Sequence, residues 1–288
     1  NITVKIAPEN VNGQEYLYAG LFGKLEETAV ISDVTFKNLK LEIAEGMREN
    51  GELILNGDDA YLRKAPDMVS NPITYFGTGE NASVRAEGIR DDDGIAYRVC
   101  CGGANMDIWL PVEGLHYVPD SLAAVAVGLK LGVEPEKIAR ALAAFRNMGG
   151  RQEIFEAKGC TIIKDCYNAG PESMDAALTV LGNKPGRRVA VLGDMLELGV
   201  RTQAEHYKIG RIAAEKADLL FAYGPTGERV LNGAVTGGMV GKARAFTDRE
   251  RLVQALKLTA KPGDVLLFKG SRGMRMELIL ERFLQTEE

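Results

Sequence analysis

The amino-acid sequence predicts an α/β protein whose C-terminal half is a mostly parallel β-sheet covered by helices on both faces. Two observations support this prediction. Short apolar runs typical of buried strands alternate with amphipathic stretches, and this alternation repeats five times. Strands that alternate with helices in this way form parallel sheets with crossover helices. The strand-like runs are Thr161–Ile163, Val189–Leu192, Leu219–Tyr223, Ala243–Phe246 and Val265–Phe268.

The region before this half is richer in short strands. Gly51–Asn56 has the pattern of a strand that ends in a turn, and Ile73–Trp109 is strand-rich, with a hairpin indicated at Asp93-Gly94. Two helices follow, because apolar residues recur there at helical spacing, and Pro135 suits a first helical turn. The apolar positions are Leu122, Val125, Ala126 and Leu129, then Ile138, Ala141, Leu142 and Phe145. We expect a domain boundary at Asn147–Gly150.

Helix starts in the C-terminal half are indicated by capping boxes at Thr202–Glu205 and Thr247–Glu250. A last helix is predicted from apolar spacing at Met276, Ile279, Leu280 and Phe283. In such a fold, ligands bind at the carboxyl ends of the strands. The first 35 residues are too few for a domain of their own.

Composition narrows the class of protein. A chain of 288 residues suggests two or three domains, and 45% hydrophobic with 26% charged residues is typical of globular proteins. The net charge of −5 disfavours nucleic acid and anionic membranes as partners. We find no apolar run of the roughly 20 residues that span a bilayer and no signal peptide, so we expect no membrane insertion and a cytoplasmic location. The four cysteines form no CxxC pair, which predicts free thiols.

Three other motifs are weak. The phosphate-loop pattern GxxxxGK[ST] is absent. Gly77–Ala82 resembles GxGxxA, but the residues after it predict a strand, so no helix N-terminus would face a pyrophosphate. Asp91–Asp93 is best explained as a solvated turn rather than a metal site.

Three polar motifs follow predicted strands of the C-terminal half, at Asp165–Ser173, Val191–Gly199 and Phe268–Arg272. An aspartate at a strand end can accept hydrogen bonds from ribose hydroxyls. The first motif can also be explained as a helix cap at Asn168 or Gly170. Cations and a hydroxyl in the third motif suit a carboxylate or a phosphate. Because these motifs end strands of one sheet, together they predict a single cleft.

These motifs resemble those of the Mur ligase family, in the branch that adds D-alanyl-D-alanine. The stretches DCYNAGPESM, VLGDMLELG and KGSRGMRME resemble the family's blocks, and the spacing fits over residues 37–288. The resemblance implies the Mur ligase architecture, in which the C-terminal domain is dinucleotide-binding-like. It divides the chain into a remnant of the UDP-substrate-binding domain (1–34), a partial central ATPase domain (35–148) and the C-terminal α/β ligase domain (149–288).

The resemblance also implies an activity. The expected reaction is ATP-dependent amide ligation, in which D-alanyl-D-alanine is added to UDP-N-acetylmuramoyl-tripeptide through an acyl phosphate during peptidoglycan synthesis. ATP and Mg²⁺ are the implied cofactors, and we expect a monomer. Two alternatives are an inactive or truncated Mur-ligase-like binding protein and another amide ligase of the same superfamily.

Residue roles follow from the same resemblance. Lys40 matches a lysine that is carbamylated in the family, so it is the implied catalytic residue and Mg²⁺ ligand. Tyr117 and Asp120 replace two asparagines of the family's adenine block, and Gly170 stands where asparagine is common. The implied ATP-binding residues are His116, Tyr117, Asp120, Arg151, Asp165, Tyr167 and Asn168. The implied substrate-binding residues are Asp194, Leu196, Lys269, Ser271 and Arg272.

The N-terminal residues resemble the family in an interrupted way. Glu9–Tyr16 and Ala29–Asp33 resemble its first domain, whereas Val34–Lys37 resembles the middle of its central domain. The family's phosphate loop and a magnesium-binding glutamate are expected between these segments. Three explanations are open: a longer natural chain from which this sequence lacks a segment, a deletion, or a paralogue that has lost the loop.

Overall fold

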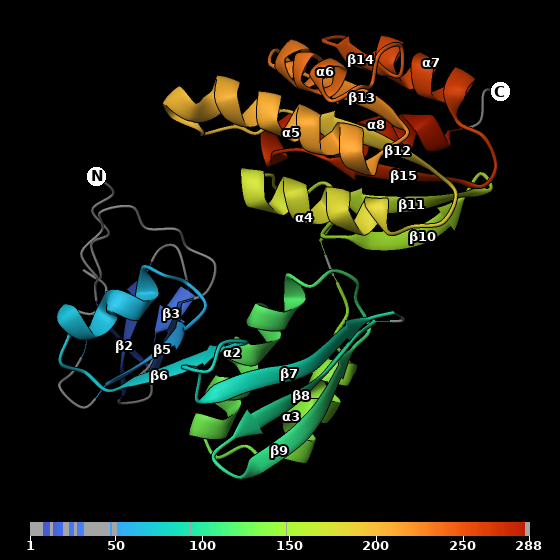
Figure 1. Ribbon diagram of the computed structural model, residues 1–288. Coiled ribbons are helices and arrows are strands. Elements are labelled where there is room, and N and C mark those ends of the chain that lie inside the picture. The colour runs from blue at the N-terminus through green and yellow to red at the C-terminus, as the bar shows by residue number, and fades with distance from the viewer. Residues whose placement is uncertain are drawn as a thin grey trace. The chain divides into compact units, whose positions relative to one another are not determined.

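The computed structural model describes residues 8–11, 14–19, 23–25, 28–31, 47, 51–92, 94–147 and 149–285. Before residue 47 it describes the backbone alone. The chain divides into two compact units, residues 1–145 (unit 1) and 146–288 (unit 2). Both combine helices with β-sheets (Figure 1), which confirms the predicted α/β class.

The described residues of unit 1 form two sheets. Three strands form a small antiparallel sheet in the order β1-β2-β3, and six strands form a larger one in the order β4-β5-β6-β7-β8-β9. Strands β4 to β7 run parallel, whereas β7, β8 and β9 are antiparallel. The strands are β1 Pro8–Val11, β2 Gln14–Ala19, β3 Gly23–Leu25, β4 Thr28–Ile31, β5 Glu52–Asn56, β6 Ile73–Gly77, β7 Val84–Asp91, β8 Ile95–Cys101 and β9 Ala104–Leu110. A 3₁₀ helix, η1, covers Leu62–Asp67.

Several predictions for this region are confirmed. A strand follows the Gly77–Ala82 motif, so the motif does not open a helix. The expected hairpin joins β7 to β8, although Asp93 itself lies outside the described residues. Strand β4, by contrast, lies in the segment 1–34 that we expected to belong to a separate domain, yet it pairs in parallel with β5 of the larger sheet.

Helices α2 (Tyr117–Lys130) and α3 (Pro135–Ala143) cover one face of the sheet and complete a core with strands β5 to β9. Leu122, Val125 and Ala126 are buried, as their spacing predicts, and Pro135 opens α3. Phe145 was wrongly included in this helix. Helix α3 ends before it, because Ala144 is the C-cap.

Unit 2 contains one six-stranded sheet in the order β10-β11-β15-β12-β13-β14. Only β10 is antiparallel to its neighbour, so the predicted mostly parallel sheet is confirmed. The strands are β10 Glu153–Ala157, β11 Cys160–Asp165, β12 Arg187–Gly193, β13 Leu219–Tyr223, β14 Ala243–Phe246 and β15 Asp264–Lys269. The last strand, β15, returns to lie between β11 and β12.

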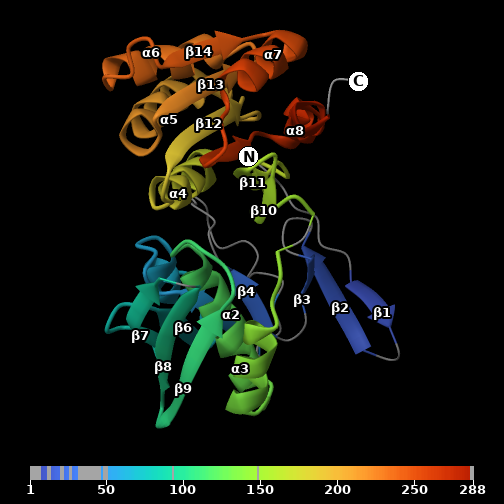
Figure 2. The same ribbon diagram turned by 90° about the vertical axis from the view of Figure 1, so that its right-hand side faces the viewer.

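Helices cover both faces of this sheet (Figure 2). Successive side chains of a strand point to opposite faces, and accordingly Ile163 packs in one core and Ile162 in the other. Helices α4 (Pro171–Gly182), α5 (Thr202–Lys216) and α6 (Gly227–Thr236) cover the first face, and α7 (Arg249–Thr259) and α8 (Met276–Leu284) the second. Two short 3₁₀ helices, η2 (Gly199–Arg201) and η3 (Arg272–Met274), precede α5 and α8.

The predicted capping boxes were wrong in detail. Helix α5 does begin at Thr202, but the Thr202 hydroxyl donates to the Gly199 carbonyl of η2 and caps nothing. The N-cap of α7 is Asp248, one residue after Thr247, and its carboxylate accepts from the Arg251 amide. A carboxylate is among the strongest N-caps, which explains the shift.

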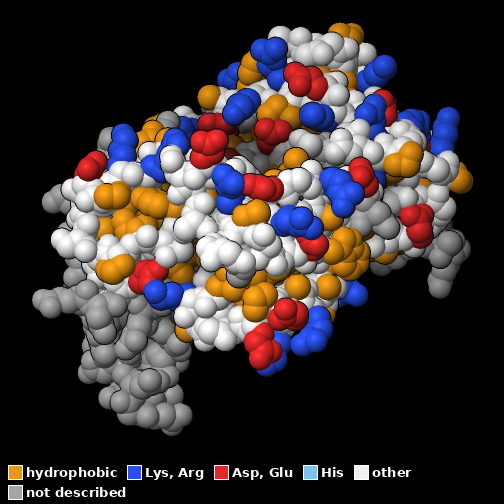
Figure 3. Space-filling model, turned by 60° about the horizontal axis from the view of Figure 1, so that its bottom comes forward, with side chains coloured by type: hydrophobic (Ala, Val, Ile, Leu, Met, Phe, Trp, Pro, Cys, Tyr) orange, Lys and Arg blue, Asp and Glu red, His pale blue; other side chains and the backbone are white. Residues whose placement is uncertain are grey.

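No helix among the described residues is long and apolar enough to cross a bilayer. On the face drawn in Figure 3, acidic and basic side chains are interspersed. All four cysteines are free; Cys160 and Cys166 are buried, whereas Cys100 and Cys101 are half-buried.

The buried hydroxyl of Tyr97 in unit 1 gives a test of this fold. It lies 2.6 Å from the Ser121 hydroxyl, and burial raises the pKa of Tyr97 from 10.0 to about 12. Between these values the phenol ionises in the unfolded chain and stays neutral in the folded one, so stability is lost as pH rises above 10. The loss should reach on the order of 2 kcal/mol.

We expect Tyr97→Phe to remove this alkaline loss, at a cost of about 1 kcal/mol at neutral pH. Urea unfolding at several pH values checks it, with the fluorescence of the single tryptophan, Trp109, reporting on unit 1. If the Tyr97→Phe variant lost as much free energy of unfolding above pH 10 as the wild type, the claim that the Tyr97 phenol stays buried and neutral would be contradicted.

Candidate active site

The three polar motifs of the C-terminal half end three neighbouring strands. Asp165 ends β11 and Lys269 ends β15, and the two residues are register partners. On its other side, Lys269 is the register partner of Leu192 in β12, and Leu192 precedes Asp194 by two residues. The return of β15 between β11 and β12 therefore brings the motifs to one edge of the sheet, as their shared position at strand ends predicts.

Lys269 and Asp165 form an ion pair at this edge. The Lys269 ammonium lies 2.6 Å from Asp165 Oδ2 and donates to the Asn168 carbonyl at 3.2 Å. Lys269 is only 2% exposed. The second carboxylate oxygen of Asp165 accepts from the Gln152 amide at 3.3 Å. Lys269 was predicted to orient a substrate, but its ammonium is held by Asp165 beneath the surface and sets the position of that carboxylate.

Arg151 and Tyr167 stack beside this pair. The Arg151 guanidinium lies 4.1 Å from the centre of the Tyr167 ring, and both residues are exposed. The turn before Arg151 is fixed to the end of β11, because the Gly150 carbonyl accepts from the amides of Cys166 at 2.7 Å and Tyr167 at 3.2 Å. Gly150 has φ +76°, which favours glycine there. A stacked guanidinium keeps its in-plane N–H groups free for an anion such as phosphate.

Ser271 links the ends of β11 and β12. Its hydroxyl donates to the Ala169 carbonyl at 3.1 Å and accepts from the Leu196 amide at 2.9 Å. The Ser271 amide donates to the Asp194 carbonyl at 3.1 Å. Ser271 was predicted to bind substrate; the buried hydroxyl instead has two partners within the protein.

Leu196 and Arg272 are the exposed members of the predicted substrate set. The Leu196 side chain is in contact with η3, since a Cβ on Gly273 would lie 2.8 Å from Leu196 Cδ1. Glu277, which the sequence did not indicate, accepts from Arg272 Nη1 at 3.0 Å. The apolar Leu196 side chain therefore lies against η3, the short helix that carries the exposed Arg272.

Asp194 is buried rather than exposed, and a histidine that we did not predict lies next to it. One Asp194 carboxylate oxygen accepts from the Thr226 amide at 2.9 Å, and the other lies 3.7 Å from His206 Nε2. His206 itself accepts from the Met195 amide. His206 lies within α5, and no motif around it indicated a functional role. The single signal in the sequence is that histidine is rare in this chain, which has two.

Cys166 lies within the first motif but is not a nucleophile. Its thiol is buried and donates to the Phe268 carbonyl at 3.4 Å. Burial raises the pKa of Cys166 to about 12. Because the thiolate is the reactive form, this cysteine is inert near neutral pH.

The predicted adenine residues lie in unit 1, at the start of α2. The rings of His116 and Tyr117 are 4.3 Å apart, and Tyr117 lies 6.3 Å from Phe145. Asp120 is exposed in the first turn of the helix. Asp91 supports this segment, because its carboxylate accepts from the Gly114 amide at 3.1 Å. Burial raises the pKa of Asp91, and the nearby Glu113 adds to the effect.

The metal prediction rests on Lys40, which lies outside the described residues. Within the described part of the chain, no three Asp, Glu, His or Cys side chains are grouped so that they could hold a metal ion.

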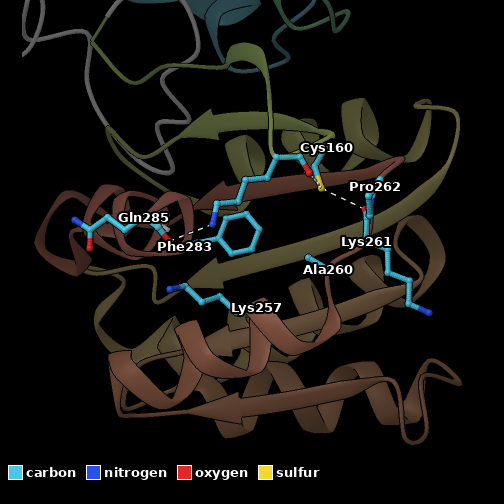
Figure 4. A pocket seen from close by; sticks show the side chains of 8 residues that line it. Cys160, Lys257, Ala260, Lys261, Pro262, Phe283 and Gln285 are labelled. Carbon is cyan, nitrogen blue, oxygen red and sulfur yellow. Dashed lines mark hydrogen bonds between the residues drawn. The ribbon is translucent and has the colours of Figure 1, made fainter. Parts of the chain in front are cut away.

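A groove lies at the opposite edge of the unit 2 sheet, at the amino ends of β11 and β15 (Figure 4). Lys158 and Lys257 line it around Phe283. The Lys158 ammonium donates to the Gln285 carbonyl at the end of α8. Cations near helix C-termini stabilise the exposed carbonyls, which accounts for these lysines without a ligand.

Comparison with known proteins identifies the family to which the chain is related. Residues 34–128 match the Mur ligase middle domain, and residues 150–272 match the Mur ligase glutamate ligase domain. The chain is similar to the UDP-N-acetylmuramoyl-tripeptide--D-alanyl-D-alanine ligases of Bacillus subtilis, with 34% identity over 86% of this chain, and of Escherichia coli, with 31% over 84%. It spans about half of these relatives, 54% of each.

The solved structures that the chain resembles include ligases of the same family. The chain is similar to a crystal structure of MurF from Acinetobacter baumannii, with TM-score 0.76 and 30% identity, covering 85% of this chain and 54% of that one. MurF ligase from Thermotoga maritima, in complex with ADP, has TM-score 0.71 and 26% identity, covering 84% and 55%.

The ion pair of Asp165 and Lys269 gives a test of the site's construction. Lys269→Met leaves a largely buried carboxylate without its cation, and we expect a loss of about 3–5 kcal/mol of stability. Adding Asp165→Asn to it should recover most of the loss, because no unpaired charge remains. Urea unfolding followed by far-ultraviolet circular dichroism measures both. If the double variant were as unstable as the sum of the two single ones, the pairing would be refuted.

Proposed function

The chain belongs to the Mur ligase family, and from this premise we propose that it is the larger part of an ATP-dependent amide ligase that adds D-alanyl-D-alanine to UDP-N-acetylmuramoyl-tripeptide. The observation that carries the proposal is the gathering of three motifs at one sheet edge, in a chain similar to ligases named for this reaction. Under this proposal the protein acts in the cytoplasm, as a monomer, in peptidoglycan precursor synthesis.

The proposed reaction has two steps. A carboxylate oxygen of the tripeptide attacks the γ-phosphorus of ATP, which forms an acyl phosphate and releases ADP. The amine of D-alanyl-D-alanine then attacks the acyl carbon, so that a C–N bond forms, the C–O bond to phosphate breaks, and the amine loses a proton as phosphate leaves. Both steps depend mainly on positioning and on neutralising charge.

In this proposal the end of β11 binds the nucleotide. Arg151, stacked on Tyr167, has in-plane donors for phosphate oxygens. Asp165 is held by Lys269 and can accept from ribose hydroxyls, with Asn168 beside it. His116, Tyr117 and Asp120 are the proposed adenine-binding residues of unit 1.

The ends of β12 and β15 bind the dipeptide. Arg272 is tethered by Glu277 through Nη1, and its other nitrogens have no partner among the described residues. A guanidinium in this state suits the free carboxylate of a dipeptide. Leu196 provides apolar surface for an alanyl methyl group. Asp194, Ser271 and Lys269 support this surface from below rather than touch the substrate.

Mg²⁺ is part of the proposal through Lys40, whose carbamate would be a carboxylate-like oxygen ligand beside the phosphates. The described residues contain no further group of carboxylate, imidazole or thiol ligands that would hold this ion.

Ligation by the full-length protein tests the proposal, with phosphate release measured in the presence of ATP, the UDP-tripeptide and D-alanyl-D-alanine. We expect Lys40→Ala to abolish ligation and Asp165→Ala to raise the KM for ATP about tenfold or more. Asp218→Ala is the matched control, because Asp218, like Asp165, pairs with a basic side chain, here Arg188, but at the amino edge of the sheet. Ligation at the wild-type rate by both site variants would refute the assignment.

The same assay separates the alternatives. A binding protein that has kept the fold without the reaction would bind ATP and release no phosphate. The absence of a GxxxxGK[ST] loop favours this alternative only if this sequence is the whole protein. A different amide ligase of the superfamily would release phosphate with another amine and not with D-alanyl-D-alanine.

A further inference from the structure

A buried polar pair links the loop that follows β12 to helix α5. Asp194 is 3% exposed and His206, on α5, is 1% exposed. Burying these groups costs free energy unless their hydrogen bonds are made. The hydrogen-bond partners of Asp194 and His206 therefore indicate which parts of the structure the pair holds in place.

His206 holds the loop by a single tautomer. Its Nε2 accepts from the Met195 amide at 2.9 Å, so this nitrogen carries no proton. In the neutral ring the proton is then on Nδ1, which lies 2.7 Å from the Thr202 carbonyl. The ring is therefore fixed at both nitrogens, and it supplies the acceptor for a loop amide that is buried.

Asp194 joins the same loop to α6. Its Oδ2 accepts from the Thr226 amide at 2.9 Å, just before the helix starts. Gly224 leaves the room for this contact, because a Cβ there would lie 2.6 Å from Asp194 Cγ. Asp194 Oδ1 is buried, has no hydrogen-bond partner among the described residues, and faces His206 Nε2 at 3.7 Å.

Three consecutive residues of the loop are thus attached to other elements. Asp194 binds Thr226, the Met195 amide binds His206, and the Leu196 amide binds Ser271. The Leu196 side chain is left exposed against η3, which carries Arg272. The position of Leu196 is accordingly set by buried bonds that do not involve its own side chain.

We propose that His206 is a positioning residue for the amine substrate: through the Met195 amide and beside Asp194, it fixes the loop so that Leu196 and Arg272 together receive the dipeptide. This inference rests on the proposed function, since it concerns the dipeptide that the ligase would use. His206 itself does not touch the substrate in this proposal, and it has no role at the nucleotide end of the sheet edge.

Removing the acceptor leaves the buried Met195 amide without a partner, which costs about as much as a lost hydrogen bond and loosens the loop. The dipeptide end of the site should suffer, because Leu196 is the next residue. The nucleotide end should not, because Arg151 and Asp165 are fixed through Gly150, Gln152 and Lys269.

The experiment compares KM values in the full-length protein. His206→Leu should raise the KM for D-alanyl-D-alanine about tenfold or more and leave the KM for ATP within about twofold. His206→Gln should restore the dipeptide KM to within about threefold of wild type. Its amide oxygen can accept from Met195, and its NH₂ group can donate to Asp194 Oδ1.

Two further variants guard against a trivial loss of stability. Ile209→Ala removes a buried apolar side chain three residues along the same helix and should leave the dipeptide KM unchanged. If His206→Leu does not fold, His206→Asn replaces it, since the shorter amide keeps a partner for Thr202 but does not reach Met195.

The outcomes separate this inference from the function on which it rests. Ligation by the wild type with an unchanged dipeptide KM in the His206→Leu and His206→Asn variants overturns the inference alone. An equal rise in all KM values, or an equal dipeptide effect in Ile209→Ala, also overturns it by assigning His206 a merely structural role. Absence of ligation in the wild type overturns the proposed function and the inference together.

Discussion

A lysine ammonium lies almost out of contact with water at the carboxyl edge of the unit 2 sheet, and the arrangement of that edge depends on it. Removing a charge from water costs several kcal/mol unless a partner of opposite charge and further hydrogen bonds compensate. Asp165 and the Asn168 carbonyl supply both for Lys269. A shift of β15 by one residue against β11 would separate the pair and point the lysine to the other face. The ion pair therefore specifies the register on which the neighbouring loops depend.

Close packing of backbone at this edge follows from glycines at two strand ends. A Cβ on Gly193 would lie 2.6 Å from the sulfur of Met276, and one on Gly270 would lie 3.0 Å from Gly193 Cα. The chains after β12 and β15 can thus lie against each other over Met276, the first residue of α8. This closeness lets the Ser271 hydroxyl span from the loop after β11 to the loop after β12.

Much of this could be predicted from sequence, and the exceptions share a physical cause. The positions of the strands and the meeting of Asp165, Lys269 and Asp194 at one edge follow from apolar runs and from the rule that parallel strands end at one edge, whereas the place of β15 between β11 and β12 was not predicted. What a polar side chain binds could not be predicted, because its partners are distant in sequence. Lys269 and Ser271 had the chemistry of ligand-binding residues but are satisfied internally. His206 was missed because its partner, the Met195 amide, is a backbone group that no side-chain pattern reveals.

The internal satisfaction of Lys269 and Ser271 bears on how the proposed ligase would set the distance between its reactants. In the proposed ligase, the nucleotide groups lie at the end of β11 and the dipeptide groups at the ends of β12 and β15, and β15 lies between β11 and β12. That strand binds the first set through Lys269 and both sets through Ser271. Ligation demands that the amine meet a short-lived acyl phosphate, and rates fall steeply when reacting groups are misplaced by as little as about 1 Å. Residues that hold neither reactant but bind both loops to the end of β15 meet this demand, because they keep the spacing between the two loops constant.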